Sequence, residues 1–128
     1  MSKPQFVFFG SSPLSVLVLE ELAKAGFIPT AVVASPDEPK GRNLVLTPPP
    51  TKVWAKSQDV SVLQPEKLRG NAEILKELSR LSYDFFMVAS YGKIIPQEIL
   101  DIPRLGTLNV HPSLLPKFRG ADPLRAQI

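Results

Sequence analysis

The stretch QFVFFGSSP, residues 5–13, decides how the chain folds, because it changes from a strand pattern to a helix start within one tight turn. Its apolar run is rich in strand-forming residues and stops at Gly10. Leucine and valine side chains then recur at helical spacing between residues 14 and 22, and Gly26 stands where a helix would end. Residues 30–34 supply a second apolar strand. A strand, a helix and a strand over this length predict a parallel βαβ crossover.

Strands and helices keep alternating along the chain, and this alternation predicts an α/β fold with a doubly wound, mostly parallel, Rossmann-like sheet. The apolar run within 84–89 is typical of a central parallel strand. The other expected elements are strands over 60–63 and 107–111 and helices over 52–57, 71–81 and 96–100.

Residues 35–51 depart from this pattern. Five of the fourteen prolines of the chain lie there, and charged residues and a glycine interrupt the rest. We expect a long loop without regular structure, and a loop of this length in a compact domain usually serves a function.

Composition excludes several classes of protein. The chain has 128 residues, 44% of them hydrophobic, which is enough for one domain with a core. It has no cysteine, which excludes disulfides, thiolate metal sites and a cysteine nucleophile, and its single histidine excludes a multi-histidine metal site. We therefore expect no metal. No apolar run is long enough to span a membrane and the N-terminus lacks a signal peptide, so we expect a cytoplasmic protein without a membrane partner.

The C-terminal part of the chain is locally basic. The net charge is +3, and four basic residues against one acid give residues 104–128 the same surplus. This surplus is compatible with an anionic partner or with an ordinary solvated surface. The pair Asp122–Pro123 is a good helix start, but only five residues follow it. We expect the chain to be a fragment of something longer.

The turn after the first strand is the first candidate site. Ligands of open α/β sheets bind at this edge, and helix N-termini attract anions, so Ser11 and Ser12 are candidate substrate-binding residues. A dinucleotide is not expected, because Ser12 and Ser15 stand where its fingerprint needs glycines. The alternative is a plain turn in which serine caps the helix.

Asn109 and His111 are the second candidate site. They are two residues apart on a strand and should share a face, with Leu108 and Val110 turned into packing. An amide and an imidazole at a sheet edge suit acyl or one-carbon transfer, although a satisfied polar pair would look the same. A histidine of this kind usually needs an orienting carboxylate. Asp84 and Asp101 are the candidates, and spacing alone places neither of them nearby.

A longer motif begins at this pair. The segment NVHPSLLPKFRG, residues 109–120, closely resembles the signature of the 10-formyltetrahydrofolate-dependent formyltransferases. The turn at 10–13, the segment 88–96 and the segment 103–106 resemble the same family. Residues 1–128 are thus identified as part of a formyltransferase catalytic domain.

The resemblance implies a role for each matching residue. Asn109 would bind the formyl oxygen and stabilise the tetrahedral intermediate, and His111 would assist and move a proton. The co-substrate 10-formyltetrahydrofolate would lie against two groups of residues, Gly92, Lys93, Ile94 and Ile95, and Ser113, Leu114, Leu115 and Pro116.

Residues 35–42 and 49–53 resemble a proline-rich loop of the family members that act on initiator methionyl-tRNA. The resemblance implies that residues 35–51 are a substrate loop, in which Lys40 and Arg42 meet phosphate or the aminoacyl end. Arg119 would add to the substrate site. The implied partners are folate and the acceptor end of methionyl-tRNA, and the implied whole protein is a monomer.

One departure from the family bears on activity. The third catalytic residue of the family is an aspartate further along, whereas this chain ends 17 residues past His111 and Asp122 does not match it. The resemblance implies that a C-terminal tRNA-binding domain lies outside this sequence as well, so we expect the fragment itself to be inactive or nearly so. Pro112 is a smaller departure, because the tRNA-directed members often carry glycine or alanine there, and it adds slightly to the second alternative, a formyltransferase that acts on an amino sugar nucleotide. A non-catalytic folate- or anion-binding module is the third alternative.

Overall fold

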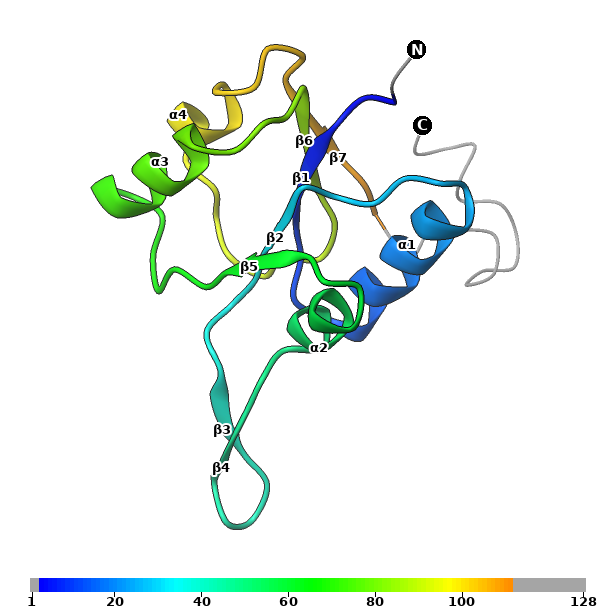
Figure 1. The fold of residues 1–128 in the computed structure, drawn as a ribbon. Coiled ribbons are helices and arrows are strands. Elements are labelled where there is room, and N and C mark those ends of the chain that lie inside the picture. The colour runs from blue at the N-terminus through cyan, green and yellow to red at the C-terminus, as the bar shows by residue number, and fades with distance from the viewer. Residues whose placement is uncertain (1–2, 112–128) are drawn as a thin grey trace.

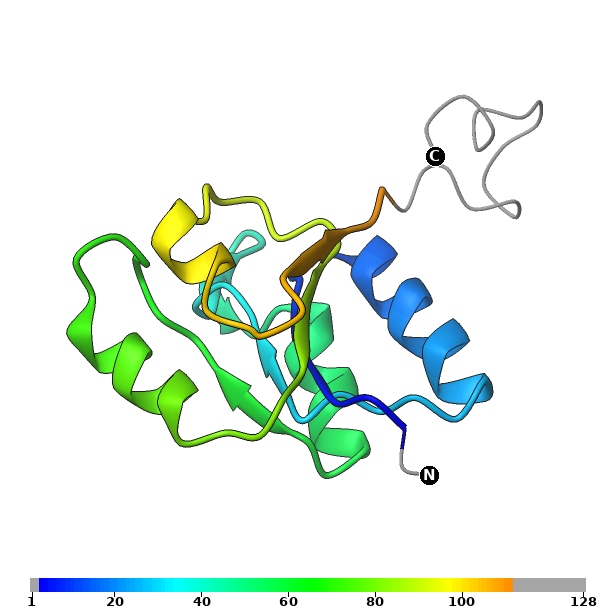
Figure 2. The same ribbon diagram turned by 90° about the horizontal axis from the view of Figure 1, so that it is seen from above.

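A parallel sheet with helices on both faces organises residues 3–111, the part of the chain that the computed structural model describes (Figure 1, Figure 2). The strand order is β5-β2-β1-β6-β7, and every neighbouring pair is parallel. The strands are β1 (Phe6–Phe9), β2 (Ala31–Val33), β5 (Ser61–Leu63), β6 (Phe85–Val88) and β7 (Thr107–Asn109). The helices are α1 (Pro13–Lys24), α2 (Pro50–Ser57), α3 (Ala72–Ser79) and α4 (Gln97–Leu100). The prediction of an α/β fold with a parallel sheet is confirmed.

The first crossover follows from local signals. All four residues of β1 are buried, as expected of a strand covered on both faces. Ser12 caps α1 through its side chain and Pro13 occupies the first helical position. The helix ends at Ala25, and Gly26 takes a φ of +91°, a conformation that glycine adopts without strain. The expected helix and its end are therefore confirmed.

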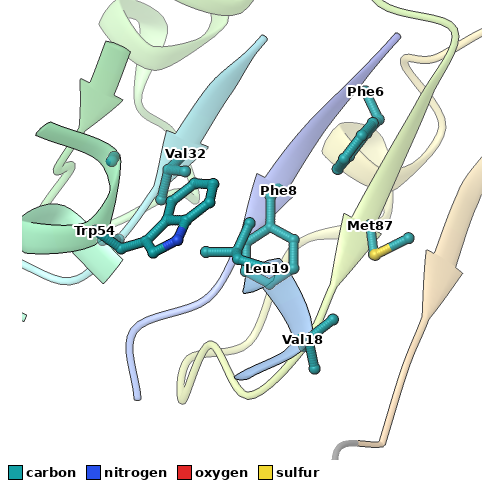
Figure 3. Close-up of a cluster of buried hydrophobic side chains, with 10 residues drawn as sticks. Phe6, Phe8, Val18, Leu19, Val32, Trp54 and Met87 are labelled. Carbon is teal, nitrogen blue, oxygen red and sulfur yellow. The ribbon is translucent and has the colours of Figure 1, made fainter. Parts of the chain in front are cut away.

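Two apolar cores lie on opposite faces of the sheet. Alternate residues of β1 point to different cores, with Phe8 on one face and Phe9 on the other. Figure 3 shows the first core, in which Leu19 of α1 and Trp54 of α2 pack around Phe8. The second core includes Leu78 of α3 and Ile99 of α4. The sheet is therefore the middle of three layers, and its polar groups are confined to the strand ends.

Residues 35–51 are not devoid of regular structure, so that expectation is wrong. An antiparallel hairpin forms from β3 (Glu38–Lys40) and β4 (Val45–Thr47) and projects from the body of the molecule (Figure 1). A ribbon of two strands has two open edges, where a proline without an N–H group is tolerated. Pro39 can therefore lie in β3, opposite Leu46.

The last described strand is shorter than expected. The prediction placed a strand over 107–111, but β7 ends at Asn109, which faces Val88, the last residue of β6. One further backbone bond joins the Val110 N–H to the Val88 carbonyl at 2.7 Å. Because β6 ends at this level, none of the strands within residues 3–111 lies beside His111 to pair with it.

Asp84 fastens the amino end of the sheet. Its carboxylate accepts a hydrogen bond from the backbone N–H of Gln5 at 2.9 Å and one from the Arg104 guanidinium at 2.9 Å. The Gln5 N–H, and then Arg104, hold the pKa of Asp84 below its ordinary value of 3.8. The ionised carboxylate therefore stabilises the folded state above that value, and the contribution is lost as the pH falls through the lower, folded pKa.

We expect Asp84→Asn to lower the free energy of unfolding at pH 7, and the difference from the wild type to shrink below about pH 4. Urea unfolding of the full-length protein at pH 7 and pH 3 measures both values. A difference that is the same at the two pH values would show that the ionised carboxylate has no such role.

Candidate functional site

The carboxyl ends of β1 and β6 form the centre of the candidate site. From β1 the chain crosses to β2 on one side, whereas β6 pairs with β1 on the other. A ligand of an open parallel sheet binds where the direction of the crossovers changes in this way. The turn after β1, the segment after β6, the end of β7 and the foot of the hairpin all lie along this edge.

Hydrogen bonds join the turn after β1 to the segment after β6. The Ser11 N–H donates to the Ser90 carbonyl at 3.1 Å, and the Ser15 hydroxyl donates to the Ala89 carbonyl at 2.6 Å. The Ser12 hydroxyl donates to the Ser90 hydroxyl at 2.7 Å. Ser90 has a φ of +59°, and this left-handed conformation, uncommon for serine, turns its polar groups toward the turn. We call residues 10–12 and 89–91, joined in this way, the ledge.

Ser11 and Ser12 already have partners inside the protein. The Ser12 side chain accepts a bond from the Ser15 N–H at 3.2 Å, while the Ser15 hydroxyl accepts one from the Ser12 N–H, so the two serines form a capping box. The Ser11 hydroxyl lies 2.9 Å from that of Ser35. Ser12 therefore caps the helix, as the alternative of a plain turn predicts. A role of Ser11 or Ser12 in binding substrate stays a prediction.

A pocket of about 400 Å³ lies beside the ledge, between β6, β7 and α4. Three predicted site residues from two separate segments of the chain line it together, namely Asn109 from one and Lys93 and Ile95 from the other. The other lining residues are Val88, Gln97, Leu100, Asp101, Gly106 and Thr107. A concave site of this size, with an apolar wall and a few polar groups, is typical of a small-molecule site.

Sequence reasoning missed some of the polar groups of this pocket. Thr107 is two residues before Asn109 on the same strand, so strand alternation alone could have identified it. Its hydroxyl donates to the Leu100 carbonyl at 2.7 Å and ties β7 to α4. The Gln97 amide donates to the Asp101 carboxylate at 2.8 Å. No local signal points to Gln97, because its place depends on where α4 packs.

The two predicted catalytic residues differ in their positions. Asn109 ends β7, is exposed and lines the pocket. His111 is also exposed, but it follows the end of β7 and is not among the pocket-lining residues. Val110 packs against the core on the opposite face, as expected. The expectation that Leu108 also packs inside is wrong, since its side chain is 52% exposed on the edge strand of the described sheet. A shared face for Asn109 and His111 stays a prediction.

The structure separates the two candidate carboxylates. Asp101 lines the same pocket as Asn109, although spacing alone did not place it there. Asp84 precedes β6 and is bonded at the amino end of the sheet, so it cannot orient a group at the carboxyl end. Among the residues described, Asp101 is thus the carboxylate that accompanies the pocket.

The remaining predicted residues fall into three places. Gly92, with a φ of +85°, begins the segment in which Lys93 donates to the Glu66 carbonyl at 2.8 Å and Ile94 is 86% exposed. Lys40 lines a second, small cavity of about 80 Å³ with Ser11 at the foot of the hairpin, and Arg42 is exposed in the hairpin turn. Ser113, Leu114, Leu115, Pro116 and Arg119 lie outside the described residues.

Tyr91 contributes a buried phenol to the ledge. Its side chain lies in the second core against Phe9, and burial raises the pKa of Tyr91 to about 12. The phenol therefore stays neutral at physiological pH.

Within residues 3–111 no cluster of three metal-binding side chains was found, and no helix there has the length and apolar character of a membrane span.

The chain matches a known family over nearly all its length. Residues 5–128 match the family described as formyl transferase. The chain is 47% identical over 122 residues to the methionyl-tRNA formyltransferase of Neisseria meningitidis serogroup C, covering 95% of this chain and 40% of that protein. It is 46% identical over 124 residues to the methionyl-tRNA formyltransferase of Halalkalibacterium halodurans, covering 97% of this chain and 39% of that protein.

A solved structure has a similar fold. The crystal structure of glycinamide ribonucleotide transformylase 1 from Geobacillus kaustophilus superimposes with a TM-score of 0.58 at 25% sequence identity. The superposition covers 99% of this chain and 70% of that chain. By contrast, the chain spans about 40% of the length of the curated relatives it matches.

Gly10 is the position of the ledge at which a side chain does not fit. A Cβ there would lie 2.6 Å from the Ala89 carbonyl oxygen and 2.7 Å from the Ser15 hydroxyl. We expect Gly10→Ala to lower the free energy of unfolding of the full-length protein by about 1–3 kcal/mol, measured by urea denaturation. Ser61→Ala, at an exposed site on β5, is the control. A Gly10→Ala protein as stable as the control would show that the contact can relax without cost.

Proposed function

The chain belongs to the formyl transferase family, and from this premise we propose the activity of the whole protein of which it is part. The proposed reaction transfers a formyl group from 10-formyltetrahydrofolate to the amino group of initiator methionyl-tRNA. The observation that carries the proposal is the pocket that Asn109, Lys93 and Ile95 line together. If the proposal holds, the protein acts in the cytoplasm with its tRNA substrate.

The pocket suits a folate co-substrate. Val88, Ile95 and Leu100 give it an apolar wall, and Gln97 and Thr107 place polar groups among them. A flat heteroaromatic ring with polar edges needs this combination. We propose that Gly92, Lys93, Ile94 and Ile95 bind it with Ser113, Leu114, Leu115 and Pro116. The bound co-substrate supplies an electrophilic formyl carbon.

Asn109 and His111 supply two separate chemical functions. The Asn109 side-chain amide can donate a hydrogen bond to an oxygen that gains negative charge as an amine attacks. The His111 imidazole can take up the proton that the amine loses and pass it to the leaving nitrogen of the folate, so that tetrahydrofolate departs as the formyl group moves to the amine. The nucleophile is the amine of the acceptor, so the enzyme needs no nucleophile of its own, in agreement with a chain that has no cysteine.

The hairpin favours a tRNA acceptor. Lys40 and Arg42 are exposed on it and can meet phosphates, with Ser11, Ser12 and Arg119 as further proposed contacts. Leu44 and Leu46 are 69% and 66% exposed, and their apolar surface can contact bases. An amino sugar nucleotide would use few of these groups.

We expect Asn109→Ala in the full-length protein to lower kcat about 10²- to 10³-fold and His111→Ala to lower it about 10²-fold, with folate affinity little changed. Formylation assays and calorimetry with the folate measure the two effects. Leu108→Ala, on the same strand and the opposite face, is the control. Folate binding with no turnover even in the wild type would favour the binding-module alternative, and unchanged turnover in both variants would contradict the site assignment.

Arg42→Ala should raise KM for methionyl-tRNA about 10-fold and leave KM for the folate unchanged, because the hairpin meets only the nucleic acid. Steady-state kinetics with each substrate varied in turn measure this. Arg69→Ala, which removes an exposed arginine outside the hairpin, is the matched control. Formylation of an amino sugar nucleotide but not of methionyl-tRNA would overturn the proposed acceptor.

A further inference from the structure

A carboxylate at the foot of the hairpin joins three segments of the chain. Asp37 lies immediately before β3, and one of its oxygens accepts bonds from the Lys52 ammonium at 3.1 Å and from the Gln64 amide at 2.7 Å. Its other oxygen lies 3.3 Å from the same ammonium. The Gln64 amide also donates to the Ser35 carbonyl at 3.1 Å. Since Lys52 lies on α2 and Gln64 follows β5, the contacts tie the hairpin to the body of the fold.

This ion pair is better shielded than the others in the described part of the chain. The Lys52 and Asp37 side chains are 22% and 32% exposed, compared with 74% and 46% for the pair of Lys24 and Glu21. The hydrogen bond from Gln64, and then that from Lys52, lower the pKa of Asp37. The carboxylate is therefore ionised at neutral pH and bound to both partners.

Most of the hairpin projects into solvent. Its strands pair with each other, and residues 38–46 are all exposed. The direction in which it projects is therefore set where it leaves and rejoins the fold. At the returning end, the buried Thr51 hydroxyl donates to the Gly10 carbonyl at 2.7 Å. At the outgoing end, the Ser35 N–H donates to the Ser11 hydroxyl at 2.9 Å, and the cluster around Asp37 holds the last residues before β3.

We propose that Asp37, Lys52 and Gln64 form a clamp that holds the hairpin in the direction in which Lys40 and Arg42 meet the acceptor. These three are positioning residues, since they act through the hairpin and touch no reacting atom. The proposal rests on the proposed function, because it assumes that the hairpin contacts tRNA. It adds that tRNA affinity depends on groups that do not themselves contact the nucleic acid.

Charge alone predicts a different outcome for the same substitutions. Removing the negative charge of Asp37 should strengthen the attraction to phosphates, and removing the positive charge of Lys52 should weaken it. A clamp predicts weaker binding in both cases, because either change frees the hairpin. Replacing the neutral Gln64 changes no charge, so only the clamp predicts an effect there.

The test measures kcat and both KM values of the full-length protein with Asp37→Asn, Lys52→Met or Gln64→Leu. We expect each change to raise KM for methionyl-tRNA about 5- to 10-fold, with KM for the folate and the melting temperature unchanged. Lys52→Arg should restore most of the affinity. Asp59→Asn and Lys76→Met remove the same charges at exposed sites outside the clamp and serve as matched controls.

Limited trypsin digestion reports on the hairpin without any substrate. Cleavage after Lys40 and Arg42 should be several times faster in the three clamp variants than in the controls. The proposal is overturned if Asp37→Asn tightens tRNA binding, or if Gln64→Leu changes neither KM nor the cleavage rate. If Arg42→Ala leaves KM for tRNA unchanged while the clamp variants speed cleavage, the tRNA role of the hairpin fails and the clamp is a structural contact only.

Discussion

The contact of the Gly10 backbone with the segment after β6 is the constraint on which the carboxyl edge of the sheet depends. The Gly10 N–H bonds to the Val33 carbonyl of β2, and the Gly10 carbonyl accepts the hydroxyl of Thr51. Next to it, Ser15 binds the Ala89 carbonyl at a distance that leaves no room for a side chain at Gly10. Gly10 therefore binds β2 and the returning end of the hairpin, and its lack of a side chain lets Ser15 bind the segment after β6 beside it. The pocket and the hairpin share this anchor, although they belong to opposite halves of the sheet.

The elements of the fold could be predicted because their signals are local. The cap at Ser12, the apolar run of β1 and the helix end at Gly26 each follow from neighbouring residues, and all three agree with the burial of both faces of the sheet. The membership of the pocket could not be predicted in the same way. Asp101 and Asn109 line one cavity because α4 packs beside β7, and no spacing in the sequence encodes that packing.

The hairpin was misjudged for a physical reason. Sequence patterns indicate strands through the alternation of buried and exposed side chains, and this ribbon buries neither face. Its prolines then favour an irregular loop. The groups that fix its foot, Asp37 and Gln64, are 27 residues apart, so only the pairing of β5 with β2 brings them together. Exposed ribbons and long-range polar contacts are the features that local patterns leave out.

The distance between the hairpin and the pocket bears on the kind of acceptor that can use both. The hairpin leaves the sheet after β2 and Asn109 ends β7, with β1 and β6 between them. Three strand spacings amount to about 14 Å. Arg42 lies in the turn between β3 and β4, and this hairpin projects away from the sheet (Figure 1). An acceptor that touches Arg42 while presenting its amine at Asn109 must extend across the ledge. A nucleic-acid strand with a reactive end has this reach and carries phosphates along it, whereas a small acceptor would lie beside the folate near Asn109 and leave the basic hairpin without a function.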